Sequence, residues 1–285
     1  MLAALRSQFP AARLELMGYP HIAQLAQAAG LVADVRSIEA RALASFFTDG
    51  GELNAELMTY LGRFAVIISF LYDPDEVFQQ NVARCGGAQF IPAQHRPDDA
   101  QQIHASEVFL KVLERLAIFD ADPVPRLSFP ETEATLPAGR WLALHPGSGG
   151  EHKNWPEGHW AQLLGELIAT TGWNLLVVGG EAEGGKLKRL AAALPGTRIK
   201  VLQSIPLVEL ARQLRQCVAF VGHDSGITHL AAAVGLPGLV LWGDTAEAVW
   251  RPRNERMWIV RRPQGLEVLS VADVLGRLNG LLRTL

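Results

Sequence analysis

The sequence predicts an α/β protein with two units, each built around a parallel sheet. Two observations predict this fold class. Short apolar segments alternate with amphipathic ones along the 285 residues, which is the pattern of parallel strands joined by helices. Residues 120–137 are rich in proline and show little periodicity, which is typical of a linker. We therefore divide the chain into a first unit at 1–125, a linker at 126–138, a second unit at 139–265 and a C-terminal helix at 266–285.

The first unit begins with a helix end rather than with a strand. The run AVIISFL at 65–71 is apolar throughout, and we expect a strand buried on both faces. Further strands are expected at 13–17, 32–38 and 89–91. Helices are expected at 1–9, 20–29, 40–61 with a break at Gly50-Gly51, after Asp73-Pro74-Asp75, and at 105–116. A doubly wound domain normally opens with a strand and a glycine-rich turn, so we expect the opening strand of this unit to be missing.

The second unit shows a full set of alternating elements. Strands are expected at 140–145, 173–179, 198–202, 218–222, 238–243 and 256–260. Helices are expected at 156–170, 183–194, 206–215, 228–234 and 270–285. The last helix carries Ser270 as its N-cap and Asp273 as a capping-box partner.

Composition narrows the class of protein. Apolar residues make up 49% and charged residues 19% of the chain, as in a globular protein with large cores. The formal net charge of -3 gives no global basic field for a nucleic acid. Cys85 and Cys217 form no CxxC pair, which favours buried free thiols in a reducing compartment. No secretory signal or apolar run of membrane-spanning length is visible, so we expect a cytoplasmic protein.

The first candidate site is the segment HPGSGG at 145–150, followed by KNWP at 153–156. It follows an expected strand and precedes an expected helix, where α/β sheets bind ligands. Its small residues let the backbone approach a phosphate, and Lys153 adds a positive charge. The spacing differs from that of a P-loop. A plain glycine-rich turn with a solvated lysine is the competing interpretation.

The second candidate site is GHDSGITHLAAA at 222–233. A strand ends in a loop that opens a helix of small residues, and Ser225 and Gly226 place backbone donors at the helix start. The alternative is an Asp224 that caps the helix and a partly buried His229. The composition also permits a Ser–His–Asp triad, but Ser225 lies in no GxSxG elbow, which argues against a hydrolase.

Three more loops follow strands of the same unit. They are LWGDT at 241–245, GGEAE at 179–183 and residues 202–207. An acid at the end of a strand, as in GGEAE, suits the hydroxyl groups of a ribose. The side chains of Trp242 and Trp155 could either face a ligand or pack in the core. All five loops leave one sheet, so we expect them to converge on one ligand site.

The order of these motifs resembles glycosyltransferase family 9, the ADP-heptose:lipopolysaccharide heptosyltransferases. The motifs are HPGSG, KNWP, VVGGEAE, SIPLVELA, FVGHDSGITHLAAA and LWGDT. The resemblance is close over about residues 141–253 and weaker over the first unit. It implies the GT-B fold, with two Rossmann-like domains that face each other across a cleft. It also implies a metal-independent sugar transfer with inversion, without a cofactor, from ADP-heptose to a lipopolysaccharide-type glycan. Peripheral association with the inner membrane is a further expectation.

The resemblance also implies which residues bind the donor. The HPGSG loop and the following lysine would contact phosphates, the acid after the glycine pair the ribose, and the DSGxTH segment the diphosphate and sugar. Leu207 would lie near the base. The residues are Ser148, Gly149, Lys153, Glu181, Glu183, Leu207, Asp224, Ser225, Gly226 and His229.

The catalytic base is unknown from this sequence. Members of the family begin with a strand and a glycine-rich loop that ends in an aspartate, and no residue here matches it. Asp73, Asp75 and Glu76 are the acids near a strand end in the first unit, with a turn or cap role as the competing interpretation. Two functions stay open, a heptosyltransferase-like enzyme and a non-catalytic nucleotide-sugar-binding protein that lacks the base.

Overall fold

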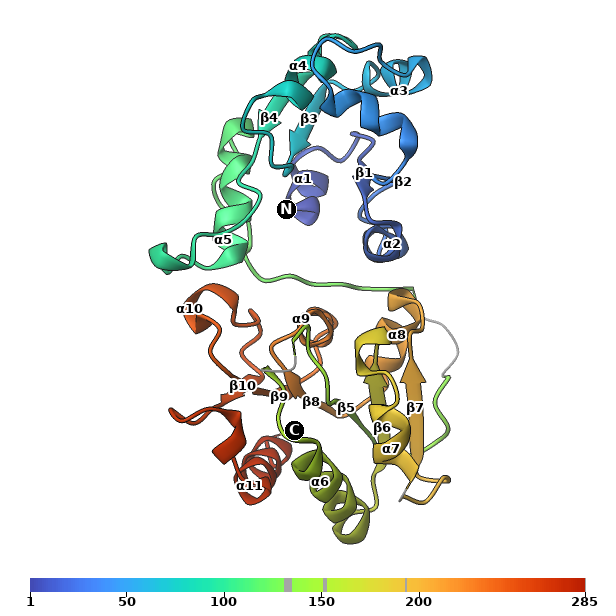
Figure 1. Cartoon of the computed structure of the whole chain (residues 1–285), viewed down its shortest axis with the longest axis vertical. Helices are drawn as coiled ribbons and strands as arrows, with labels where there is room; N and C mark the ends of the chain where they lie inside the picture. The colour runs from blue at the N-terminus through green and yellow to red at the C-terminus, as the bar shows by residue number, and fades with distance from the viewer. Residues whose placement is uncertain (131–134, 151–152, 193, 285) are drawn as a thin grey trace. The chain divides into compact units, whose positions relative to one another are not determined.

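The structure is a computed structural model that describes residues 1–130, 135–150, 153–192 and 194–284. The chain forms two compact units, Met1–Pro123 and Val124–Leu285 (Figure 1). Residues 131–134 of the expected linker and residue 193 of the helix expected at 183–194 lie outside the described residues.

Unit 2, Val124–Leu285, is built on a six-stranded sheet in the order β10-β9-β8-β5-β6-β7. Every neighbouring pair is parallel. The strands are β5 (Trp141–His145), β6 (Asn174–Gly179), β7 (Ile199–Gln203), β8 (Ala219–His223), β9 (Gly238–Leu241) and β10 (Met257–Val260). Since all strands are parallel, their carboxyl ends share one edge of the sheet.

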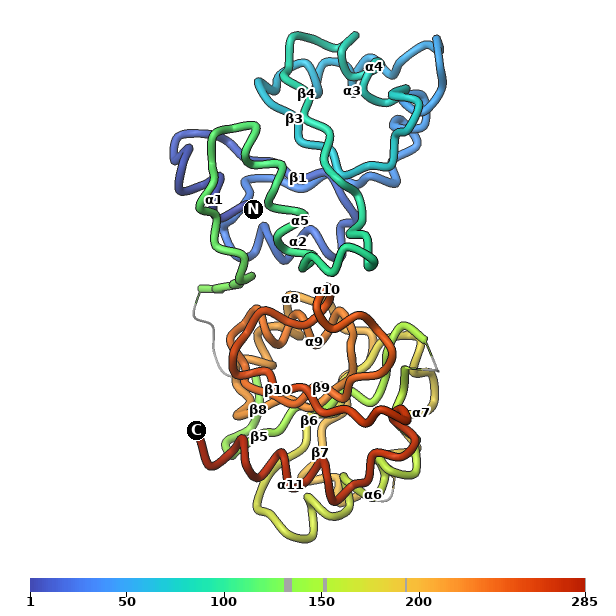
Figure 2. The backbone as a smooth tube through the Cα atoms, turned by 90° about the vertical axis from the view of Figure 1, so that its left-hand side faces the viewer, coloured from blue at the N-terminus to red at the C-terminus, as the bar shows by residue number. Residues whose placement is uncertain are grey.

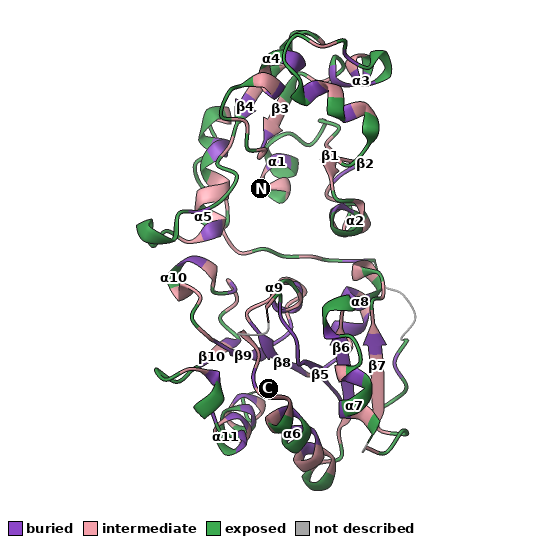
Figure 3. Cartoon of the chain, in the orientation of Figure 1, coloured by how far each residue is buried: buried purple, intermediate pink, exposed green. Residues whose placement is uncertain are grey.

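Helices cover both faces of this sheet. Figure 2 shows α8 (Leu207–Leu214), α9 (Gly226–Ala233) and α10 (Glu247–Trp250) on one face, and α6 (Glu157–Thr170) and α11 (Val271–Leu282) on the other. α7 (Lys186–Ala192) shares a core with α6 and α11. Short 3-10 turns lie at η5 (Glu181–Glu183) and η6 (Leu266–Val268). β5, β8 and β9 are buried along their whole length (Figure 3), as expected for strands that are covered on two faces.

Unit 1, Met1–Pro123, contains two separate two-stranded parallel sheets. One pairs β1 (Glu15–Gly18) with β2 (Asp34–Ser37), and the other pairs β3 (Val66–Ser69) with β4 (Gln89–Pro92). The helices are α1 (Leu2–Gln8), α2 (Pro20–Ala28), α3 (Ala55–Leu61), α4 (Val77–Ala83) and α5 (Ala105–Leu110). The 3-10 helices are η1 (Arg41–Phe47), η2 (Asp99–Gln101) and η3 (Lys111–Leu116).

Three sequence predictions for unit 1 need correction. The strand at 65–71 is not buried on both faces, because Val66 is 37% exposed and the next two residues of β3 are only half-buried. The expected helix at 40–61 is a 3-10 helix followed by α3, which Asn54 caps by accepting the Leu57 N–H at 3.0 Å. The expected helix at 105–116 passes from α5 into η3. Composition indicated helix in both places but did not distinguish the 3-10 form.

Candidate functional site

The candidate site lies where the strand order of unit 2 reverses direction. β5 connects onward to β6 and β7 on one side, whereas β8 returns to pair with the other side of β5. In open α/β sheets, ligands bind at such a switch point, beyond the carboxyl ends of the strands. The HPGSG loop leaves β5 and the DSG loop leaves β8, so the two strongest sequence motifs flank this point.

The loop after β5 leaves its backbone available to a ligand. The Ser148 side chain turns into its own loop, where Oγ donates to the Gly150 carbonyl oxygen at 2.8 Å. Gly149 is exposed, and a Cβ built on it would meet no atom within 4 Å. Gly147 differs, because a Cβ there would lie 1.8 Å from Glu183 Oε1. Gly147 therefore permits close packing, whereas Gly149 permits close approach from solvent.

Lys153 and Asp224 pair with each other across the switch point. Lys153 Nζ lies 3.3 Å from Asp224 Oδ2, and the two side chains are 34% and 11% exposed. One residue follows the loop after β5 and the other follows β8. The alternative interpretation, in which Asp224 caps the helix, does not hold, because Ser225 is the N-cap of α9. A cation is thus held next to the start of α9, where backbone N–H groups already favour an anion.

Ser225 acts in the structure as a helix cap. Its Oγ accepts the Thr228 backbone N–H at 3.3 Å and lies 3.2 Å from His145 Nδ1. The buried Thr228 hydroxyl donates to the His223 carbonyl oxygen. Gly226 is exposed at the first turn, and His229 lies half-buried one turn further along α9. Because Asp224 pairs with a lysine and Ser225 caps a helix, the residues do not form a Ser–His–Asp triad.

His223 ties the two loops together. Its Nε2 accepts the Trp155 backbone N–H at 2.8 Å, and its Nδ1 lies 3.0 Å from the Gly147 carbonyl oxygen. An N–H can only donate and a carbonyl can only accept, so the ring is neutral with its proton on Nδ1. Burial lowers the pKa of His223 to about 4. The hydrogen bond to the Gly147 carbonyl oxygen has the opposite, smaller effect and raises the pKa, because it favours the charged form. The nearby Lys186 charge lowers the pKa further.

His145 is the second buried histidine at this edge. Burial, with smaller contributions from His223 and Lys186, lowers the pKa of His145 to about 3. A neutral ring cannot form an ion pair with Glu183, whose Oε1 lies 3.8 Å from His145 Nε2, a distance beyond a hydrogen bond. Lys186 Nζ donates to the Pro146 carbonyl oxygen at 2.8 Å and thereby braces the HPGSG loop from α7.

The two candidate acids for ribose differ in the structure. Glu183 is buried, and its Oε2 accepts the Gly180 backbone N–H at 2.5 Å. Glu181 is exposed at the start of η5. Glu183 therefore holds the loop that follows β6, while Glu181 is available to a ligand hydroxyl.

The remaining loop residues divide between ligand edge and core. Leu207 is half-buried at the start of α8, just beyond β7. Trp242 is buried and donates from Nε1 to the Thr245 carbonyl oxygen at 2.8 Å. Trp155 is also buried, with Nε1 bonded to the Leu269 carbonyl oxygen at 2.8 Å. Both tryptophans belong to the core rather than to a ligand face.

The three candidate bases of unit 1 follow β3. Asp73 Oδ1 and Oδ2 accept the backbone N–H groups of Phe78 and Gln79 at 3.1 and 2.9 Å, so Asp73 caps the start of α4. Asp75 and Glu76 are exposed in the same turn, and Glu76 has a φ of 57°. The turn and cap interpretation therefore describes these residues better than a base.

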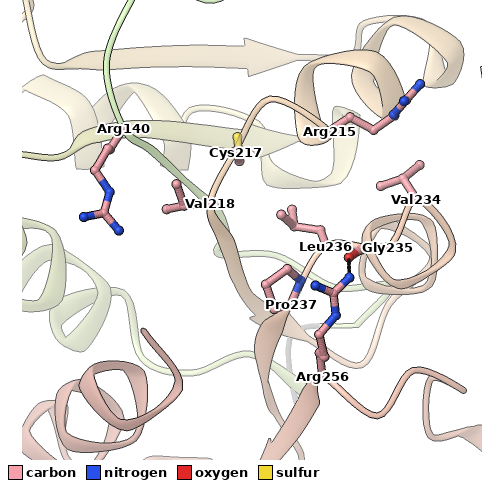
Figure 4. A pocket seen from close by; sticks show the side chains of 9 residues that line it. All are labelled: Arg140, Arg215, Cys217, Val218, Val234, Gly235, Leu236, Pro237 and Arg256. Carbon is pink, nitrogen blue, oxygen red and sulfur yellow. Dashed lines mark hydrogen bonds between the residues drawn. The ribbon is translucent and has the colours of Figure 1, made fainter. Parts of the chain in front are cut away.

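A pocket at the opposite edge of the unit 2 sheet is a separate feature (Figure 4). Each of its arginines has a partner within unit 2. Arg256 donates to the carbonyl oxygen of Gly235, just past the end of α9, as is common at helix C-termini. Arg215 donates to the carbonyl oxygen of Phe129 at 3.0 Å, and Arg140 stacks on Trp173 with Cζ 5.1 Å from the ring centroid.

Two further properties of the described residues bear on the class of site. They contain no group of three or more His, Cys, Asp or Glu side chains placed to hold a metal ion. None of the helices in the described ranges is long and apolar enough to cross a membrane. The free thiols are Cys85, which is half-buried, and Cys217, which is buried.

Sequence reasoning missed the bracing roles of His145, His223 and Lys186. A signal was available, because His145 is the last residue of one expected strand and His223 directly follows another, and these two strands turn out to be neighbours. His145 pairs in register with Gly222, next to His223. Only the strand order shows this proximity.

Comparisons with known proteins identify the family of the chain. Residues 94–269 match glycosyltransferase family 9 (heptosyltransferase). Lipopolysaccharide heptosyltransferase 1 of Escherichia coli (strain K12) is 30% identical over 152 residues, which cover 53% of this chain and 47% of that protein. Lipopolysaccharide heptosyltransferase 1 of Pseudomonas aeruginosa is 36% identical over 135 residues, which cover 47% of this chain and 33% of that protein. The matched part thus spans half or less of the length of these relatives.

A solved structure, E. coli heptosyltransferase WaaC with ADP, superposes with a TM-score of 0.73 at 20% identity. The superposition covers 98% of this chain and 93% of that one. It confirms the GT-B fold predicted from the sequence.

Proposed function

The chain belongs to glycosyltransferase family 9, and from this premise we propose that it transfers a sugar from a nucleotide-diphospho-sugar to a glycan. ADP-heptose is the proposed donor, and a lipopolysaccharide-type core glycan is the proposed acceptor. The reaction inverts the anomeric centre: the acceptor hydroxyl attacks the anomeric carbon, and the bond to the diphosphate oxygen breaks. The proton of the hydroxyl passes to a base, and the diphosphate leaves with the electron pair.

The observation that carries this proposal is the pair of loops at the switch point of the unit 2 sheet. Gly149 offers backbone without a side chain, and α9 begins at the exposed Gly226, where the first backbone N–H groups of a helix have no partner within the helix. Lys153 supplies positive charge within reach of both loops. Donors that are already in position can stabilise the charge that develops on the leaving diphosphate. We place Glu181 at the ribose, Leu207 near the base, and Asp224 and His229 at the sugar.

The lysine would exchange partners on binding. In the structure its ammonium group faces Asp224, whereas a diphosphate carries more charge and more acceptor oxygens than one carboxylate. Asp224 would then accept hydrogen bonds from sugar hydroxyls. This exchange distinguishes a nucleotide sugar, which satisfies both residues, from a nucleotide alone.

The direct test is a transfer assay. The chain is incubated with ADP-heptose and a deacylated lipopolysaccharide-core oligosaccharide, and ADP release and the configuration of the new linkage are followed by NMR. We expect an inverted linkage and an unchanged rate with EDTA, since no metal is proposed. Donor turnover without a new linkage, or loss of activity with EDTA, would contradict the proposal.

A second function has one observation in its favour. Asp73 is occupied as the cap of α4, and the other two candidate acids, Asp75 and Glu76, are exposed in the same turn. A non-catalytic nucleotide-sugar-binding protein would bind ADP-heptose and release no ADP when acceptor is added.

We further propose a cytoplasmic location with peripheral association with the inner membrane, which fractionation of cells into membrane and supernatant would test.

A further inference from the structure

A tyrosine and a histidine form an exposed ring pair beyond the β3–β4 sheet. Tyr72 follows β3 and His95 follows β4, and their ring centroids lie 4.9 Å apart with the planes tilted by 57°. β3 and β4 are parallel neighbours, so the segments that leave their carboxyl ends share one edge (Figure 1). Tyr72 is 71% exposed, so the histidine covers only part of its ring.

The backbone next to Tyr72 is held on its C-terminal side. Asp73 binds two backbone N–H groups of α4, those of Phe78 and Gln79. On its N-terminal side, Ser69 Oγ accepts the Leu71 N–H at 3.3 Å. The ring therefore projects from a fixed turn rather than from a loose loop.

The segment before His95 continues the strand ladder. The Ala93 N–H donates to the Ser69 carbonyl oxygen at 2.8 Å, one step beyond the last register pair of β3 and β4. A further bond from Gln94 Nε2 to the Arg96 carbonyl oxygen, at 2.9 Å, closes the turn around His95. The backbone that carries both rings is thus held by hydrogen bonds on either side, and the rings contact each other, which reduces the ordering cost of binding.

The chemistry of the pair fits one sugar ring. An aromatic ring has a flat apolar face, and tyrosine and histidine add polar atoms at the rim. A pyranose has a matching apolar face of C–H groups and a rim of hydroxyl groups. A protein partner would need about 800 Å² of surface on each side, whereas two side chains suit a ligand of monosaccharide size.

We propose that Tyr72 and His95 form a subsite for one sugar unit of the glycan acceptor. The inference rests on the proposed function, because the acceptor class comes from it. The face of Tyr72 stacks on the sugar, and the imidazole of His95 bonds to a hydroxyl group at the rim. The place of the pair agrees with the rule that α/β sheets bind ligands at the carboxyl ends of their strands.

The test compares Tyr72→Ala and Tyr72→Phe in the full chain. Calorimetric titration with a deacylated lipopolysaccharide-core oligosaccharide measures glycan affinity, and titration with ADP measures the donor site. An aromatic contact of this kind predicts a loss of about two- to tenfold in glycan affinity for Tyr72→Ala. We expect Tyr72→Phe to stay close to the wild type and ADP affinity to stay unchanged in both variants. Phe119→Ala is the matched control, since Phe119 is 72% exposed and follows η3 instead of a strand.

The outcomes separate the subsite from the proposed transfer. Glycan binding that falls in Tyr72→Ala alone supports the subsite, even if no sugar is transferred. Where transfer is measurable, the KM for the acceptor should rise while kcat stays the same. Equal glycan affinity in Tyr72→Ala and the wild type, no glycan binding by the wild type, or a parallel loss in Phe119→Ala would overturn the inference.

Discussion

His223 accepts the backbone N–H of Trp155 at 2.8 Å, which joins the end of β8 to the segment that follows the HPGSG loop. The same ring donates to the Gly147 carbonyl oxygen at 3.0 Å. One buried side chain therefore fixes the relative position of the two loops that we assign to the donor diphosphate. Protonation of Nε2 would place two donors against each other and break the bond to Trp155.

The first prediction concerns pH and stability. The folded pKa values of His145 and His223, about 3 and about 4, lie below the ordinary 6.5. Between pH 6.5 and 4 the unfolded chain therefore binds protons that the folded chain does not. Stability is fully present above pH 6.5 and falls below it, by about 1.4 kcal/mol per pH unit for each histidine.

Urea unfolding at pH 7, 6 and 5 checks this dependence. All seven tryptophans lie in unit 2, so tryptophan fluorescence follows that unit. His223→Gln should be less stable at pH 7 and should lose less stability on acidification. A slope that is the same in His223→Gln and the wild type would contradict the assignment.

The second prediction separates packing from ligand approach in the HPGSG loop. Gly147→Ala should destabilise unit 2, because its Cβ would fall on the Glu183 carboxylate, and overpacking typically costs about 1–3 kcal/mol. Gly149→Ala has open space around it and should keep the wild-type stability while ADP affinity drops. Thermal unfolding and ADP titration of both variants measure the two effects. The reverse pattern would show that Gly149 is structural.

The third prediction concerns Lys153 and Asp224. Lys153→Ala should weaken ADP binding about ten- to a hundredfold, since a charge-assisted bond contributes about 1.5–3 kcal/mol. Lys188→Ala, an exposed lysine on α7, is the control and should bind ADP normally. Unchanged ADP affinity in Lys153→Ala would show that Lys153 is a solvated surface lysine that does not contact the ligand.

The fourth prediction follows from the ion pair. Asp224→Ala should reduce affinity for ADP-heptose more than affinity for ADP, because the carboxylate repels a diphosphate unless sugar hydroxyls bind to it. Calorimetry with the two ligands gives the ratio. An equal loss for both would indicate that Asp224 acts only through the structure of the loop.

The fifth prediction distinguishes the two acids after β6. Glu181→Gln should lower ADP affinity and leave the unfolding temperature unchanged, because Glu181 is exposed. Glu183→Gln should lower the unfolding temperature, because its carboxylate is buried against the Gly180 N–H. If Glu183→Gln keeps the wild-type unfolding temperature but binds ADP less tightly, then Glu183, and not Glu181, is the residue that contacts the ligand.

The sequence predicted the parts of the site that depend on strand ends. Parallel strands must end at one edge, so the loops that contain Gly149 and Gly226 could be placed together without coordinates. The choice between Glu181 and Glu183 could not be made, since it depends on which way a short 3-10 turn directs each carboxylate. The role of His223 depends on burial and on strand order, which are tertiary properties. Val66 was misassigned because an apolar run does not reveal whether other elements cover both faces of its strand.

Calorimetric titration of the folded chain with ADP tests whether the carboxyl edge of the unit 2 sheet binds the diphosphate of the donor. We expect a dissociation constant in the micromolar range, which corresponds to about -8 kcal/mol at 1 μM, and a clear loss in Gly149→Ala at unchanged stability. Absence of binding by ADP and by every other nucleoside diphosphate, with the chain shown to be folded, would contradict the claim.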